Sequence, residues 1–263
     1  MLSDETPYPT WPPGLWRRII LQPGRSGHLS WIGGALEDDM HRFHMRFDHA
    51  DGRIIRASAQ ALRHPWSACP GAAPLIAGEL TGALLADVAR RDPAQHCTHL
   101  YDLAVVMAAH AEDTEPTRFD MRVADRVDEH TTAALEENGE ESLRWQLDGT
   151  VITGPGPYAG RDLRKLSQWK QDLPLRDAER ATILRRAVFI SGGRQFVAPA
   201  TEHAAQQGPM RMGPMRMGVC FNYQMPQAAG STRTPDWRKD FSTSDIEPLA
   251  GLDAEAELGA MAP

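Results

Sequence analysis

Short stretches in which apolar and polar residues strictly alternate, each beside a turn dipeptide, constrain the fold of this chain more than any other feature. Within residues 41–48, one side of an extended backbone would carry His41, Phe43, Met45 and Phe47. The opposite side would carry Arg42, His44, Arg46 and Asp48. Asp51-Gly52 then supplies a tight turn into residues 53–62, so the pattern predicts a β-hairpin.

The same pattern returns in the middle of the chain. Phe119, Met121 and Val123 alternate with polar residues. Two further hairpin dipeptides, Asn138-Gly139 and Asp148-Gly149, flank a third alternating stretch that contains Leu143, Trp145 and Leu147. Together these residues predict an antiparallel meander with one buried face.

Helical spacing of apolar residues appears in four segments, residues 74–91, 98–112, 161–173 and 177–190. Thr98 can cap the second of these helices. Strand-rich segments followed by helices, twice, predict an α+β fold in which antiparallel hairpins or a meander are packed by about four helices. A molecule made of two similar halves would give this repeated order of strands followed by helices, although no sequence repeat relates the two halves.

The predicted organisation is a single α+β domain over residues 15–240. Within it, residues 15–113 and 114–198 each run from β-rich to helical, and residues 199–240 form a C-terminal loop region. Proline-rich residues 1–14 are expected to be disordered, and residues 241–263 to be a loose acidic tail. The methionine-rich repeat at 208–218 is expected to be a surface loop, with a ligand lid as the alternative.

Composition excludes several classes of protein. The net charge of −7 argues against a nucleic-acid partner, because phosphates attract clustered Lys and Arg. The longest apolar run, residues 103–109, is far shorter than the roughly 20 residues that span a bilayer. Three cysteines and no secretion signal favour a reducing cytoplasm. We therefore expect a soluble cytoplasmic protein, with a homodimer left open.

Two motifs resemble a known bacterial family. Residues 63–72 read RHPWSACPGA, and a Cys-Thr-His-Leu run follows at 97–100. With His44-Met45-Arg46, and less firmly residues 219–221 and 230–233, this pattern is similar to domain-of-unknown-function family 2889 over residues 15–240. The family name supplies no chemistry. Longer members accompany the breakdown of aromatic or polycyclic carbon sources, so the resemblance implies an aromatic substrate class.

The densest polar cluster surrounds the Cys-Thr-His-Leu run. If a helix begins near Thr98, then His99 and Asp102 share one face, and the carboxylate could fix the tautomer of the imidazole. His99 and Asp102 are therefore candidate catalytic residues. Cys97 would lie at the helix N-terminus, which favours a thiolate, although a buried cysteine is the commoner outcome.

The polar side of the first hairpin offers a second pair. His44 and Arg46 lie about 7 Å apart on one face of a strand. An imidazole beside a guanidinium suits an anionic or phenolic oxygen, because Arg stabilises the negative charge while His moves the proton. A simply solvated face is the alternative. We expect His44 and Arg46 to converge with His99 in a shared hollow.

Other residues are candidates for substrate binding or for metal binding. The predicted substrate-binding residues are Trp66, Cys97, Tyr158, Phe221 and Tyr223. Cys69, between two prolines, is expected to be structural. His41 and His44 would face opposite sides of a strand, and no Cys-x-x-Cys or His-Glu-x-x-His spacing exists, so no metal is predicted. Dinucleotide, phosphate-loop and serine-hydrolase motifs are also absent, so no cofactor is predicted.

Three functional hypotheses remain open from the sequence. The first is a cofactor-independent lyase that cleaves a carbon–carbon bond of a phenolic aromatic compound by a retro-aldol step, releasing formaldehyde or a similar fragment. The second is a non-catalytic ligand-binding or accessory protein of an aromatic or steroid degradation pathway. The third is a cysteine-dependent hydrolase or thioesterase that uses Cys97.

Overall fold

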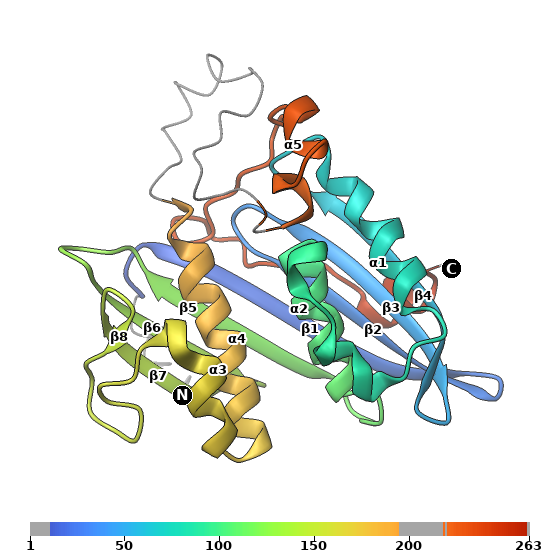
Figure 1. The fold of residues 1–263 in the computed structure, drawn as a ribbon, viewed down its shortest axis with the longest axis horizontal. Coiled ribbons are helices and arrows are strands. Elements are labelled where there is room, and N and C mark those ends of the chain that lie inside the picture. Colours follow the sequence, from blue (N-terminus) through green and yellow to red (C-terminus); the bar gives the residue numbers. More distant parts are fainter. Residues whose placement is uncertain (1–10, 195–217, 219, 262–263) are drawn as a thin grey trace, which may run out of the picture.

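One antiparallel sheet of eight strands, in the order β4-β3-β2-β1-β5-β6-β7-β8, organises the molecule (Figure 1). This computed structural model describes residues 11–194, 218 and 220–261. The strands are β1 Gly14–Ser26, β2 Leu29–Glu37, β3 Arg42–Ala50, β4 Arg53–Arg63, β5 Thr117–Ala124, β6 His130–Glu137, β7 Glu140–Asp148 and β8 Val151–Ile152. With the helices described below, the sheet confirms the predicted α+β class.

The turn dipeptides form the hairpins that they predict. Asp51 and Gly52 join β3 to β4 with φ angles of 49° and 71°. Asn138 and Gly139 join β6 to β7 with φ angles of 54° and 88°. Both residues of each turn have the positive φ that Asn, Asp and Gly tolerate, which matches the twist of the flanking strands.

Strands β1 and β2 lie inside the sheet, and alternation alone locates neither of them. Glycines interrupt their pattern where other side chains come close to the backbone. A Cβ on Gly34 would lie 2.6 Å from Sδ of Met107, and a Cβ on Gly33 would lie 2.5 Å from Cβ of Leu258. These glycines therefore let chain segments pack on both faces of β2.

Four helices lie on one face of the sheet, here called the front face (Figure 1). They are α1 Ala72–Leu80, α2 Thr98–Ala109, α3 Leu166–Trp169 and α4 Leu175–Ser191. Two of the predicted helices are wrong in extent. Residues 74–91 break at Gly82, whose φ is 86°, and residues 161–173 form three short turns in place of one helix.

The elements from β1 to α2 and those from β5 to α4 follow similar plans. Four strands and then helices are found in residues 14–109, and again in residues 117–191. The two sets of strands meet where β1 pairs with β5. Phe43, Phe47, Phe119 and Trp145 belong to the buried front-face core, as their alternation predicts.

The opposite face, here called the back face, is covered over β1 to β3 by the C-terminal chain. Helix α6, Ala254–Gly259, buries Leu258 completely, and Leu249 and Met261 pack with it against Ala35. The expectation of a loose tail from residue 241 is therefore wrong. Its few apolar residues have a partner only in the folded sheet, which composition does not reveal.

Some predictions fall beyond the described residues. Residues 1–10 and most of the methionine-rich repeat at 208–218 lie outside them. Gly14, the last residue of the segment expected to be disordered, opens β1. Among the described residues, no helix combines the length and the apolar character that crossing a bilayer requires.

Candidate functional site

A cavity of about 580 Å³ opens on the front face. The start of β3, residues 65–72, the N-terminal end of α2, the C-terminal end of α4 and residues 220–237 surround it. Its aromatic lining residues are Phe43, Trp66, Phe189, Phe221, Tyr223 and Trp237. A largely apolar cavity with a few polar groups is the usual form of a small-molecule site.

The polar part of the wall is built on a carboxylate–imidazole pair. Nδ1 of His41 lies 3.0 Å from Oδ1 of Asp38, and Nη1 of Arg17 lies 2.7 Å from Oδ2. A carboxylate can only accept, so Nδ1 of His41 donates this hydrogen bond. Asp38 and Arg17 are fully buried, whereas His41 lines the cavity.

A tight turn between β2 and β3 holds this pair in place. Oδ1 of Asp38 also accepts hydrogen bonds from the backbone amides of Met40 and His41, each at 2.9 Å. Burial alone would raise the pKa of Asp38. The charge and hydrogen bond of His41, followed by the charge of Arg17, outweigh burial and hold that pKa well below its usual range.

A second imidazole stacks on the first. The rings of His41 and His99 have centroids 3.7 Å apart and an interplanar angle of 29°. Burial lowers the pKa of His99 well below its usual value, and positive charge on His41 and Arg17 lowers it further. His99 is therefore neutral at pH 7, and of the two stacked rings His41 is the one that is hydrogen-bonded to the Asp38 carboxylate.

Two arginines give the cavity wall its positive charge. Arg186 is held by Asp102, with Nε 2.5 Å from one carboxylate oxygen and Nη2 3.0 Å from the other. The guanidinium carbon of Arg233 lies 3.9 Å from the ring centroid of Trp66 and 4.4 Å from that of Trp237. Among the described lining residues there is no Asp or Glu.

All three cysteines line the same cavity. Burial raises the pKa of Cys69 to about 12 and also raises that of Cys97 and of Cys220. Amide hydrogen bonds from Leu100 and His99 at the start of α2 do not offset burial at Cys97. The helix N-terminus therefore does not favour a thiolate at Cys97, and the commoner outcome, a buried cysteine, describes this residue.

The structure brings together five of the residues predicted from sequence. Those that line the front cavity are Trp66, Cys97, His99, Phe221 and Tyr223. Tyr158 is elsewhere, since its ring packs against Trp145 and Trp169 under the second half of the sheet. The predicted pairing of Asp102 with His99 is also wrong, because the carboxylate bonds to Arg186 and the imidazole stacks on His41.

The predicted convergence of His44 and Arg46 with His99 is wrong. Both side chains point to the back face, one residue out of phase with the front-facing Phe43 and Met45. Arg46 bonds to the carbonyl of Gly259 and stacks on Trp31, and His44 lies near Glu257. A strand sends neighbouring side chains to opposite faces, so His44 cannot reach a helix that packs on the front.

Sequence reasoning missed Asp38, Arg186 and Arg233, and it treated His41 only as a zinc ligand. One signal was available for His41, because alternation places it on the same face as Phe43. Asp38 precedes it by three residues in a turn, which is a spacing that allows a local side-chain bond. No local signal marks Arg186. Arg233 belongs to residues 230–233 of the resemblance pattern, but that pattern does not indicate that it lies beside Trp66.

Three residues at the site could hold a metal ion. Asp38, His41 and His99 each place one ligand atom within 4.8 Å of the others. However, Asp38 already accepts bonds from two amides, His41 and Arg17. Nearly parallel stacked rings also do not aim their nitrogens at one point, so these residues fit proton transfer better than metal binding.

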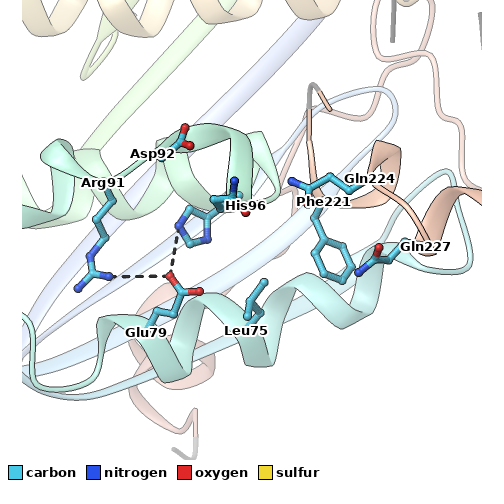
Figure 2. Close-up of a pocket in the computed structure, with 9 residues that line it drawn as sticks. Leu75, Glu79, Arg91, Asp92, His96, Phe221, Gln224 and Gln227 are labelled. Carbon is cyan, nitrogen blue, oxygen red and sulfur yellow. Dashed lines mark ion pairs between the residues drawn. The ribbon is translucent and has the colours of Figure 1, made fainter. Parts of the chain in front are cut away.

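A second, smaller cavity of about 380 Å³ lies between α1 and residues 91–96, and shares Phe221 with the first (Figure 2). In this cavity one carboxylate oxygen of Glu79 lies 3.5 Å from Nε2 of His96 and 3.8 Å from Nη1 of Arg91. Burial lowers the pKa of His96. Asp92 adds a second carboxylate to this wall.

Comparison with protein-family models and with curated proteins found no match to this chain. The resemblance to family 2889 therefore stays a prediction. Any function must be argued from the front cavity, where an Asp-His pair, a neutral imidazole and two arginines meet an aromatic wall.

Proposed function

We propose that this protein is a cofactor-independent lyase that cleaves a carbon–carbon bond of a phenolic aromatic compound by a retro-aldol step. The observation that carries the proposal is the Asp38–His41 pair at the wall of an aromatic cavity. The buried carboxylate orients the imidazole and stabilises the imidazolium that forms when His41 takes a proton.

The reaction needs one base and no redox partner. His41 takes the proton of a side-chain hydroxyl through Nε2, and the O–H electron pair forms the C=O bond of a released aldehyde, formaldehyde in the simplest case. The carbon–carbon bond breaks, and its electron pair passes into a conjugated acceptor of the remaining fragment. The imidazolium then returns its proton to that fragment, which balances the step.

The rest of the cavity supports the same substrate class. Phe43, Trp66 and Tyr223 offer aromatic faces for a ring. Arg186 and Arg233 place positive charge where a phenolate or another anionic oxygen would be held. His99 stacks on His41 and is neutral because burial lowers its pKa, so we assign the role of base to His41, the ring that is hydrogen-bonded to Asp38.

The test is formaldehyde release from phenolic dimers that carry a hydroxymethyl side chain. We expect turnover by the wild-type protein, and a loss of about 10³-fold in kcat for His41→Gln, the usual size of a general-base contribution. The matched control is His44→Gln on the back face, which should keep kcat within about twofold. Thermal unfolding of each variant checks that the fold is retained.

Full turnover by His41→Gln would remove the assignment of the base. Binding of the dimers without any product would favour the second hypothesis, a ligand-binding protein, which the same aromatic cavity accommodates. The cysteine-hydrolase hypothesis has less support, because burial raises the pKa of all three thiols and so disfavours a thiolate at neutral pH.

A further inference from the structure

The smaller cavity holds a buried imidazole whose side chain makes no hydrogen bond within the described part of the chain. Only 2% of His96 is exposed, and its Nδ1 is buried without a partner. Its Nε2 lies 3.5 Å from a carboxylate oxygen of Glu79, and the same oxygen lies 3.8 Å from Nη1 of Arg91 (Figure 2). Both distances exceed the roughly 2.7–3.2 Å of an N–H···O hydrogen bond. A buried polar group in this state is unfavourable unless a further partner completes its bonding.

Backbone and ring contacts hold His96 in place. The carbonyl of His96 accepts a hydrogen bond from the amide of Phe221 at 3.0 Å, and the side-chain amide of Gln224 donates to the carbonyl of Ala94. The ring of His96 also stacks on that of Tyr101, with centroids 5.7 Å apart and an interplanar angle of 7°. These contacts fix the imidazole at the cavity wall and use neither of its nitrogens.

The charges of the lining favour a cation. Glu79 and Asp92 carry two negative charges against the one positive charge of Arg91. Burial lowers the pKa of His96, so its ring is neutral at pH 7 and adds an acceptor nitrogen rather than a charge. Asp92 already accepts a bond from the amide of Ala94 at 2.9 Å, whereas Glu79 has only the two long contacts. A cationic ligand with N–H donors therefore matches this wall, and Glu79 is its main acceptor.

The remainder of the lining includes apolar surface. Figure 2 shows the ring of Phe221 at the opposite end of the cavity from Arg91. Leu75, from α1, also lines the cavity and is 37% exposed. An apolar group next to the cation would cover both side chains and remove them from water.

An organic cation fits this cavity better than a metal ion. Within the described residues, ligand atoms gather within 4.8 Å of one another only at Asp38, His41 and His99, which belong to the front cavity wall. Glu79, Asp92 and His96 do not close on one point in this way, as a bound metal requires.

We infer that the smaller cavity is a second ligand site, and that it binds a primary ammonium group carried on a short aromatic or aliphatic chain. One ammonium nitrogen can donate both to the Glu79 carboxylate and to Nε2 of neutral His96, because these acceptors lie 3.5 Å apart. The chain packs on Leu75 and Phe221. Phe221 is the one residue that the described linings of the two cavities share, and the inference does not rest on the proposed function.

The test measures binding, which does not depend on turnover. Isothermal titration calorimetry at pH 7.5 compares 2-phenylethylamine, a cation at this pH, with the neutral 2-phenylethanol. We expect the amine to bind the wild-type protein at least about tenfold more tightly than the alcohol, the usual worth of a charge-assisted hydrogen bond. This preference should shrink as salt is added.

Variants assign the preference to one carboxylate. Glu79→Gln should lower the affinity for the amine to that for the alcohol, while alcohol binding stays within about twofold. The matched control is Asp87→Asn, because Asp87 also pairs with an arginine, Arg90 at 2.7 Å, but lies outside the cavity lining. It should bind both compounds as the wild-type protein does, and thermal unfolding checks that each variant is folded.

Nitrogen-15 NMR of the histidine rings shows which cavity the amine enters. The ring resonances of His96 should shift with saturation, while those of His41 stay in place. Shifts at His41 with His96 unchanged would put the amine in the front cavity and overturn the second site. Equal affinities for amine and alcohol, or no binding of either, would also overturn it, and a preference that persists in Glu79→Gln would overturn the role of Glu79. None of these results alters the expected release of formaldehyde, so the two proposals fail separately.

Discussion

The two sides of strand β3 offer the same residue types to different surroundings. At the front, His41, the residue just before β3, is bonded to Asp38 and lines a cavity. At its back, His44 and Arg46 lie under the C-terminal chain, where Arg46 bonds to the carbonyl of Gly259. A shift of one residue along a strand therefore decides whether an imidazole meets a ligand or a packed segment.

The ion pairs of the two faces differ in how deeply they are buried. The largest predicted loss of stability follows from removing the more deeply buried pair. On the front, Asp38 and Arg17 are both fully buried. Asp38→Ala would leave the Arg17 guanidinium buried beside an empty site, which costs about 3–5 kcal/mol in the free energy of unfolding. Urea denaturation measures this loss.

The back-face counterpart is Asp48, which pairs with buried Arg46 and half-exposed Arg56. Asp48→Ala should cost less, about 1–2 kcal/mol, because Arg56 can turn to solvent and Arg46 keeps its carbonyl partner. Equal losses for Asp38→Ala and Asp48→Ala would contradict the distinction between the faces.

The next effect tests whether the C-terminal chain is part of the fold. Leu258 in α6 is fully buried, and its side chain contacts Gly33 of β2. Leu258→Ala should lower the free energy of unfolding by roughly 3 kcal/mol, as for other buried leucines. The half-buried Leu252 is the control, and Leu252→Ala should cost clearly less in the same denaturation experiment.

His44, on the back face, makes the stability of the folded protein depend on pH. Burial lowers its pKa to about 4, and the charge of Arg42 contributes, so the folded state favours neutral imidazole. Between pH 6.5 and 4, His44 therefore binds more protons in the unfolded chain than in the folded one. Its contribution to the free energy of unfolding is fully present above pH 6.5 and is lost as the pH falls toward 4.

The expected loss is about 3 kcal/mol, and it can be followed by urea denaturation at several pH values. His44→Leu should remove this part of the pH dependence while leaving the contributions of other groups. A variant with the same slope between pH 6.5 and 4 as the wild-type protein would show that His44 is not buried in its neutral form.

The smallest effect concerns the front-face thiols. Burial raises the pKa of Cys97, so its sulfur contributes packing rather than nucleophilic attack. Cys97→Ser should keep formaldehyde release within a few-fold of the wild-type rate. A loss comparable to that of His41→Gln would instead favour the cysteine-dependent hydrolase.

Local sequence predicts strands β3 and β5 and the hairpins at Asp51-Gly52 and Asn138-Gly139 well, because their determinants are local. The turns at Asp51-Gly52 and Asn138-Gly139 need positive φ, and alternation marks the buried face of β3 and β5. Strand β2 is harder, because Gly33 and Gly34 interrupt alternation to admit Leu258 and Met107. These contacts exist only in the folded molecule, so the sequence alone does not explain the glycines.

The candidate site is predictable only in part, for a similar reason. The aromatic and helix-start residues Trp66, His99 and Phe221 could be selected from sequence, and they do line one cavity. Arg233 joins Trp66 from a segment more than 160 residues away, and composition does not indicate that they meet. His44 has a residue type that suits catalysis, but its position in β3 directs the side chain to the back face, away from the cavity.

Nitrogen-15 NMR of the histidine rings during titration with 4-hydroxycinnamate tests the central claim most directly, because it reports which imidazole meets the ligand. The account predicts that the ring resonances of His41 and His99 shift with saturation, while those of His44 stay in place. Shifts confined to His44, with His41 unchanged, would place the ligand on the back face and contradict it.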